Sequence, residues 1–304
     1  MRTVRQFAPR ALIAAFVLAL LAYGAISYRV ADGVTKLERK PLEPAAAAVS
    51  SVHEDVSFTA TDGLLLKGWW FPTGAVAGGP GAQAAKPDKA VDKIAPLFLA
   101  RGWDVLLFDL RGHGESAGDR YSLGQYEPRD IVGAIDFVHE RTGIDRRRIA
   151  VIGESLGGGS AIMTVAADPT IGPVVTDSAY SDGYTVVAEV GQNYTGLPSW
   201  FTPGIVLTSK YFFGLDVLKV KPYEVVGTHP ERAWLFIECD ADKTVFPHHG
   251  TDLRTASANP DTELWMVRGC DHVQAFTKHP EEWARYVFAF LDREIAKVPP
   301  AASR

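Results

Sequence analysis

Cysteine, basic clusters and internal repeats are scarce or missing in this chain. Its two cysteines, Cys239 and Cys270, are too few for a disulfide framework or a structural zinc site. We predict that they are two buried thiols, with a single disulfide as the alternative. No run of five or more basic residues occurs, which argues against a nucleic-acid partner.

The overall composition is that of an ordinary globular protein. Of 304 residues, 47% are hydrophobic and 22% are charged, and the formal net charge is −5. These values argue against disorder, collagen and coiled coil. A chain of this length is able to bury enough surface for one large core.

The N-terminus departs from this soluble pattern. Residues 11–28 carry no charge and follow Arg2, Arg5 and Arg10. Because about 20 apolar residues span a bilayer, we predict that residues 1–28 form a single-pass membrane anchor. The basic leader favours a cytoplasmic N-terminus and an extracytoplasmic domain at the cell membrane. The alternative is a signal peptide cleaved before Ala25, which would give a secreted or periplasmic protein.

The remaining chain divides into a linker, one domain and a short tail. We predict a linker at 29–52, an α/β domain at 53–298 and a tail at 299–304. A hairpin at 53–59 and 64–71 is followed by short apolar runs at 104–108, 149–152, 173–175, 233–237 and 262–267. Helix-periodic segments lie between them, at 125–141, 156–167, 249–258 and 280–296. This alternation predicts a mostly parallel sheet with helices on both faces.

One long segment interrupts that alternation. Residues 181–228 are rich in aromatic side chains and separate two predicted strands. A segment at that place is a candidate lid over an apolar substrate site. The alternative is that its aromatic residues simply pack the insertion onto the sheet.

A G-x-S-x-G pattern marks the candidate nucleophile. Gly153, Ser155 and Gly157 stand between a predicted strand and a glycine-rich helix. A serine on such a sharp turn has a strained backbone, and flanking glycines remove side chains that would clash. The backbone N–H of Leu156, at the start of the helix, would then face a developing oxyanion.

A serine nucleophile needs a base and an acid that orients the base. With the chain order Ser, acid, His, the best base is His272, in a loop after a predicted strand. Asp242 is our candidate acid, and we expect Asp240 to cap its own turn instead. His229 is a further downstream histidine. His248 and His249 lie at a predicted helix start and are interpreted as solvated caps, and His279, before Pro280, is interpreted as structural.

These motifs together resemble the α/β-hydrolase superfamily over residues 53–295. The run F-D-L-R-G-H-G-E-S at 108–116 is similar to a strand-end loop of the membrane-anchored BEM46/ABHD13-like group. The acid and base loops of that group are matched at Asp242, Val245, Pro247, Gly269 and His272. The resemblance implies that Ser155 is the nucleophile, His272 the general base and Asp242 its orienting acid. It also implies a structural role for His113.

One segment departs from the family pattern. These hydrolases carry a buried strand and a His-Gly pair that supplies a second oxyanion N–H. Residues 73–89 are instead rich in glycine and alanine and contain no histidine. Loss of one oxyanion donor typically costs about 10²–10³ in rate.

Taken together, the sequence predicts a serine hydrolase that cleaves a carboxylic ester or thioester through an acyl-serine intermediate. The expected substrate is a small-molecule acyl ester or a lipid-like molecule. We expect no metal and no organic cofactor. Two alternatives stay open: a peptidase or amidase with the same triad, and a catalytically impaired pseudoenzyme or binding module without the usual oxyanion loop.

Overall fold

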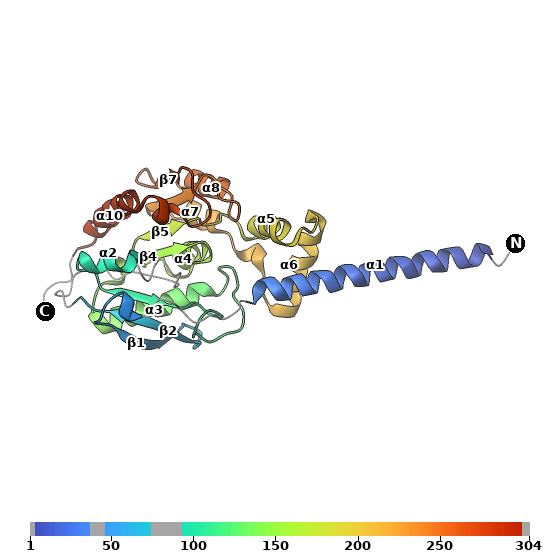
Figure 1. Cartoon of the computed structure of the whole chain (residues 1–304), viewed down its shortest axis with the longest axis horizontal. Helices are drawn as coiled ribbons and strands as arrows, with labels where there is room; N and C mark the ends of the chain where they lie inside the picture. The colour runs from blue at the N-terminus through green and yellow to red at the C-terminus, as the bar shows by residue number, and fades with distance from the viewer. Residues whose placement is uncertain (1–3, 37–45, 74–92, 300–304) are drawn as a thin grey trace.

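The computed structural model describes residues 4–36, 46–73 and 93–299. Figure 1 shows a globular domain and one long helix that projects from it. The strands are β1 (Glu54–Thr59), β2 (Leu65–Phe71), β3 (Val105–Phe108), β4 (Val151–Glu154), β5 (Val174–Asp177), β6 (Trp234–Cys239) and β7 (Glu263–Val267).

The α-helices begin with the projecting helix and continue around the sheet. They are α1 (Val4–Thr35), α2 (Ala95–Ala100), α3 (Glu127–Thr142), α4 (Leu156–Ala167), α5 (Gly183–Thr195), α6 (Thr202–Phe213), α7 (Pro222–Thr228), α8 (His248–Ala256), α9 (Ala275–Lys278) and α10 (Pro280–Ala296).

The strands of the described residues form two sheets. β1, β2 and β3 pair antiparallel, in that order. β4, β5, β6 and β7 pair in parallel, in that order. Every residue of β6 is buried, as expected for a strand covered on both faces. Because the strands are parallel, the ends of β4, β6 and β7 meet at one edge.

Helices cover both faces of the parallel sheet, which confirms the predicted architecture. On one face, Phe98 of α2 and Phe290 of α10 share an apolar cluster with Ile237. On the other face, Ile162 of α4 packs in a cluster with Phe236. Neighbouring residues of β6 thus point to opposite faces, as the period of a strand requires.

The N-terminal helix is longer than the sequence predicted. α1 continues to Thr35, so the first part of the linker expected at 29–52 is helical. By length and composition, the segment Arg10–Thr35 of α1 is long and apolar enough to cross a membrane. The helix continues because its last two turns are stabilised by packing against the domain, which a local composition pattern does not reveal.

The base of α1 is docked on α6. The Tyr23 hydroxyl donates to the Trp200 carbonyl oxygen and accepts the N–H of Gly204, both at 3.0 Å. A Cβ on Gly204 would lie 2.5 Å from Ser27 Oγ, so glycine permits this close approach. Arg120 forms an ion pair with Asp32 of α1. The helix therefore contacts the domain through specific side chains.

The insertion at 181–228 folds as α5, α6 and α7. α5 and α6 lie beside the base of α1 (Figure 1), whereas α7 packs against α4 and α8. Phe201 is buried, but Trp200, Tyr211 and Phe212 are 60%, 76% and 70% exposed. The alternative that the aromatic residues pack the insertion onto the sheet is therefore wrong for these three.

The prediction of two free thiols is also wrong, because Cys239 and Cys270 form a disulfide. Cys239 ends β6 and pairs with Val267 of β7, and Cys270 follows in the loop after β7. This register brings the two Cα atoms to 5.1 Å, within the range a disulfide needs. The bond joins the two loops that carry the candidate acid and base.

Candidate active site

The candidate nucleophile stands on a strained turn between β4 and α4. Ser155 has φ 50° and ψ −114°, a conformation that non-glycine residues rarely adopt. Its N–H donates to the Asp177 carbonyl at 2.8 Å, which ties the turn to β5. A Cβ on Gly153 would lie 2.3 Å from the Gly157 carbonyl oxygen. The glycine at position 153 is therefore required for so tight a turn.

The structure brings Ser155, His272 and Asp242 into one hydrogen-bonded line. His272 Nε2 lies 2.9 Å from Ser155 Oγ, and His272 Nδ1 lies 2.7 Å from Asp242 Oδ2. An ionised carboxylate only accepts, so Nδ1 carries the proton and Nε2 accepts from the serine. Ser155 and His272 are half-buried, whereas the Asp242 side chain is fully buried.

Backbone N–H groups hold the Asp242 carboxylate. Its Oδ1 accepts from Thr244 at 2.8 Å and from Val245 at 2.9 Å, which leaves Oδ2 for the histidine. The Asp240 side chain does not contact His272. Its Oδ1 accepts the N–H of Gly269, in the loop that carries His272, at 2.7 Å. The expectation that Asp240 caps its own turn is thus corrected.

The histidine loop has a support that sequence reasoning missed. Ser178 Oγ accepts the N–H of Val273 at 3.0 Å and donates to Asp177 Oδ1 at 3.0 Å. Val273 is β-branched and has φ 56°, a genuine outlier that its surroundings must hold in place. Ser178 directly follows β5, at the same sheet edge as Ser155, Asp242 and His272. That position after a strand is the sequence signal that could have identified it.

The candidate oxyanion donor lies at the start of α4. Leu156 is the first residue of that helix, and the first N–H groups of a helix have no intrahelical acceptor. The region predicted to lack the second donor, residues 73–89, lies outside the described residues except for Thr73. That prediction stays a prediction.

The loop at 108–116 is ordered by charge pairs away from the triad line. Arg111 donates to Asp130 Oδ1 at 2.7 Å and to Asp62 Oδ1 at 3.1 Å. Burial works against the charged guanidinium, but these carboxylates outweigh it and raise the pKa of Arg111. His113 Nδ1 lies 2.9 Å from the Arg111 carbonyl oxygen. These contacts hold the loop at 108–116 in one conformation.

A buried acid lies close to the candidate site. Glu238 of β6 is completely buried, and its Oε1 accepts the N–H of Ala179 at 3.2 Å. Burial, together with the negative charges of Asp177 and Asp242, raises the pKa of Glu238 well above its usual range. The neutral acid is therefore favoured beside the charged Asp242.

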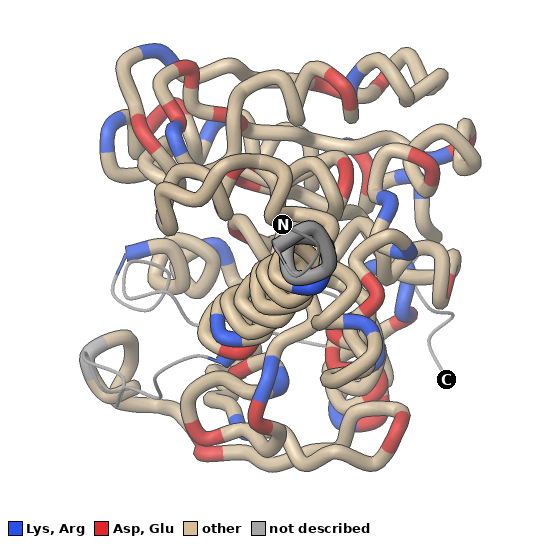
Figure 2. The backbone as a smooth tube through the Cα atoms, turned by 90° about the vertical axis from the view of Figure 1, so that its right-hand side faces the viewer, with Lys and Arg blue, Asp and Glu red and all other residues tan. Residues whose placement is uncertain are grey.

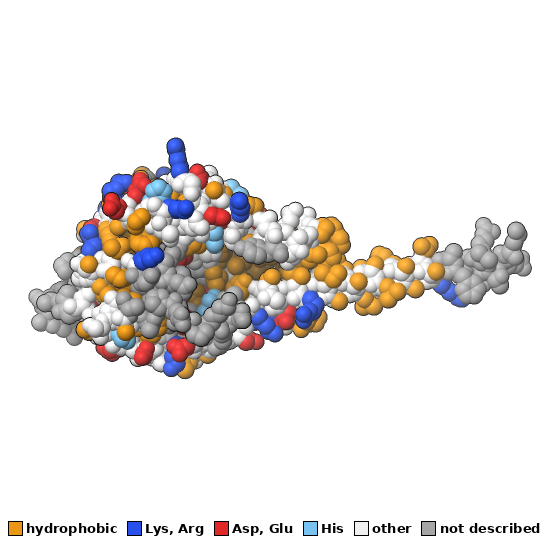
Figure 3. All heavy atoms as spheres, viewed as in Figure 1, with side chains coloured by type: hydrophobic (Ala, Val, Ile, Leu, Met, Phe, Trp, Pro, Cys, Tyr) orange, Lys and Arg blue, Asp and Glu red, His pale blue; other side chains and the backbone are white. Residues whose placement is uncertain are grey.

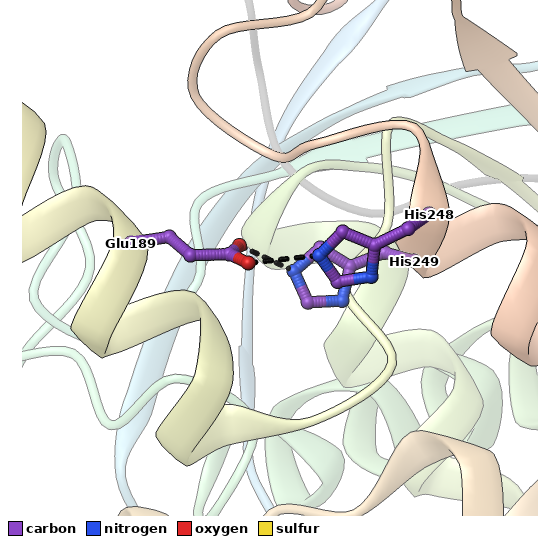
Figure 4. A group of neighbouring side chains, drawn as sticks. All are labelled: Glu189, His248 and His249. Atoms are coloured by element: carbon purple, nitrogen blue, oxygen red, sulfur yellow. Dashed lines mark hydrogen bonds and ion pairs between the residues drawn. The ribbon is translucent and has the colours of Figure 1, made fainter.

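A second histidine cluster lies between α5 and α8 (Figure 4). His248 Nε2 and His249 Nε2 lie 2.8 and 3.0 Å from the two Glu189 oxygens. His249 Nδ1 accepts the backbone N–H of Ser181 at 3.1 Å, so its Nε2 must carry a proton. A protonated nitrogen is no metal ligand, and the three groups fit a hydrogen-bonded bridge better than a metal centre.

The pKa values of the two histidines in this cluster are shifted in opposite directions. Burial opposes protonation of His248, but its contacts with Glu189 and Asp252 outweigh that effect and raise the pKa of His248. Burial lowers the pKa of His249, and the neighbouring His248 lowers it further. The expectation that both are solvated caps is wrong for His249, which is fully buried.

Comparison with solved structures identifies the fold. The structure of the Pyrococcus furiosus esterase Pf2001 aligns with a TM-score of 0.69 and 22% identity, covering 86% of this chain and 98% of that one. The alpha/beta hydrolase GrgF from Penicillium sp. aligns with a TM-score of 0.63 and 20% identity, covering 81% and 99%. The chain has the α/β-hydrolase fold.

Sequence comparisons agree with this α/β-hydrolase assignment. The family model for serine aminopeptidase, S33, matches residues 88–212, which include the Ser155 turn and all but the last residue of α6. The chain is 25% identical over 279 residues to the uncharacterized protein YfhR of Salmonella typhi, covering 82% of each. The narrower resemblance to the BEM46/ABHD13-like group stays a prediction.

Proposed function

We propose that this protein is a serine hydrolase that cleaves carboxylic esters or thioesters. The observation that carries the proposal is the line of contacts from Ser155 through His272 to Asp242, at 2.9 and 2.7 Å. A base within hydrogen-bond reach of a serine, oriented by a carboxylate, is the arrangement that activates a hydroxyl nucleophile.

In the proposed reaction, Ser155 Oγ attacks the acyl carbon while His272 Nε2 takes its proton. The tetrahedral oxyanion receives a hydrogen bond from the Leu156 N–H. His272 then returns the proton to the leaving alcohol or thiol, which departs and leaves an acyl-serine. Water attacks that ester with His272 again as base, which releases the acid and restores the Ser155 hydroxyl. Asp242 stabilises the imidazolium at both stages.

The two comparisons point to different reactions: one supports ester cleavage and the other supports amide cleavage. The Pf2001 structure is that of an esterase, whereas the matching family model is named for a serine aminopeptidase. The same triad serves both reactions. We keep the esterase as the first proposal, because an alcohol leaves more readily than an amine and makes the smaller demand on a second oxyanion donor.

We also propose that α1 is an uncleaved membrane anchor. Cleavage before Ala25 would remove Tyr23, whose hydroxyl joins Trp200 and Gly204. It would also uncover Phe201, which stacks on Tyr23 at 4.9 Å. Figure 2, seen along α1, shows charges of both signs around the domain, whereas on α1 they lie near its ends. The contacts of Tyr23 and the uncharged middle of α1 together support retention of the helix as an anchor.

The test is labelling of the detergent-solubilised full chain with a fluorophosphonate probe, which reacts with activated serines. We expect labelling of the wild type and no labelling of Ser155→Ala or His272→Ala. Absence of labelling in a folded wild type would favour the pseudoenzyme. Turnover of p-nitrophenyl acetate against the matching anilide then separates esterase from amidase.

A further inference from the structure

A cavity lies where the projecting helix meets the insertion. It has a volume of about 490 Å³, within the usual range for a small-molecule site. Its walls come from the base of α1, from α5 and from α6, including Val34, Val187, Val190 and Val206. Lys36 is the only charged side chain among its described lining residues. The cavity therefore suits an apolar ligand.

The cavity borders the candidate acid loop. Thr244 lines it, and the Thr244 N–H donates to Asp242 at 2.8 Å. Leu123 and Val190 also line it, and they pack in a cluster with Tyr180 and Val245. An apolar chain in this cavity would thus end beside the loop that orients His272.

The outer side of this junction is unusually apolar. Trp200, Leu207, Tyr211 and Phe212 of the α6 region are all more than half exposed. Figure 3 shows hydrophobic side chains continuing from α1 onto the adjoining edge of the domain, which is hollowed beside the base of the helix. Monomeric soluble proteins rarely expose so continuous an apolar surface.

The geometry of α1 sets the depth of that surface. Arg10 and Arg29 bracket the uncharged stretch and are about 28 Å apart along a helix, close to the thickness of a bilayer core. Tyr23 lies about 9 Å inside Arg29 on the same scale. Trp200 stacks on Tyr23 with ring centroids 5.6 Å apart. Trp200 would thus lie below the level of Arg29, at about the 5–10 Å depth to which helices at a membrane surface bury their apolar faces.

We propose that the exposed face of the α6 region rests in the membrane interface, and that the cavity beside it receives the acyl chain of a membrane-resident lipid ester. The exposed face of the α6 region continues the apolar surface of α1. A membrane that surrounds α1 would therefore also cover the α6 face. The substrate then reaches Ser155 from the bilayer rather than from water. This inference rests on the proposed ester chemistry and membrane anchor, and it adds the substrate class.

Trp200 provides a direct probe of the surface. Six of the seven tryptophans are buried, and Trp200 is the exposed one. The full chain would be placed in phosphatidylcholine nanodiscs whose acyl chains carry bromine, which quenches nearby tryptophan. We expect the fluorescence that Trp200→Phe removes to be lost in brominated discs. Persistence of that fluorescence, with quenching by aqueous acrylamide instead, would overturn the interfacial placement.

Gly191 provides a probe of the cavity. It lines the cavity from α5, and an added Cβ would meet nothing within 4 Å. Gly191→Leu should therefore fill the space without strain and favour the helix. The matched control is Gly24→Leu on α1, also with nothing within 4 Å and outside the cavity lining.

The readout is cross-linking of a diazirine-labelled fatty acid to these variants in a Ser155→Ala background. We expect adducts on α5 and α6 peptides, reduced about tenfold or more by Gly191→Leu and unchanged by Gly24→Leu. Equal labelling of both variants would overturn the proposal. Neither experiment requires hydrolysis, so a failure of the proposed function would appear separately, as a wild type that the fluorophosphonate does not label.

Discussion

The sheet edge that carries the candidate active site and the junction of α1, α5 and α6 are held by different interactions. At the sheet edge, backbone N–H groups fix the Asp242 carboxylate and the Ser155 turn. At the junction, ring stacking of Tyr23 and packing around Gly204 hold the apolar helix α1 against the insertion. The proposed chemistry of the site and the proposed access to it therefore depend on separate sets of contacts.

Substitution of Asp242, the buried candidate acid, should give the largest effect. Asp242→Asn keeps the shape but favours the wrong histidine tautomer, so we expect kcat/KM for p-nitrophenyl acetate to fall by about 10⁴. The matched control is Asp240→Asn at the same strand end, where the carboxylate only holds Gly269. An equal loss in both variants would show that Asp242 is a loop-forming residue rather than a triad member.

The next effect concerns the support of the histidine loop. Ser178→Ala leaves the Val273 N–H without its acceptor and should let His272 shift. We expect kcat to fall about tenfold while KM stays unchanged, since a lost hydrogen bond of this kind costs about 1–3 kcal/mol. Ser257→Ala, which breaks a buried contact with Thr262 elsewhere, should lower stability only. A similar kcat for both variants would refute the positioning role of Ser178.

A change at the helix junction should affect access without touching the chemistry. Gly204→Val would push against Ser27 and Tyr23, and overpacking of this kind costs about 1–3 kcal/mol. We expect faster hydrogen exchange in α6 and an unchanged rate of fluorophosphonate labelling. Gly24→Val, with open space around its Cβ, should change neither. A fall in labelling for Gly204→Val alone would mean that the two regions are coupled.

The smallest effect concerns His248, which begins α8 and contacts Glu189 of α5. Its raised pKa means that the bridge from Glu189 to Asp252 stabilises α5 below about pH 6.5 and weakens as pH rises through the folded-state pKa. Because His248 is 44% exposed, screening keeps the effect small. We expect α5 protection factors to fall at alkaline pH in the wild type and to stay flat in His248→Gln. Identical profiles would contradict this assignment.

Much of the fold was readable because its signals are local. The helices at 156–167 and 280–296 have the bounds that their flanking residues predicted. The positions of Ser155, Asp242 and His272 followed from strand ends and chain order, since parallel strands bring their carboxyl ends together.

What escaped prediction depends on contacts between distant segments. The pairing of Cys239 with Cys270 requires the register of β6 against β7. The docking of α1 depends on Tyr23 meeting Gly204, 181 residues further along the chain. Composition and periodicity describe one segment at a time and carry no information about such partners.

The disulfide also bears on the compartment in which the proposed anchor would place the domain. Such bonds form and persist in oxidising compartments, whereas a cytosolic thiol pool keeps cysteines reduced. Cys239 and Cys270 precede Asp242 and His272 by only a few residues. A domain in the periplasm or outside the cell would thus acquire the covalent tie between its acid and base loops only after export. Redox environment, independently of the basic leader, favours the extracytoplasmic placement.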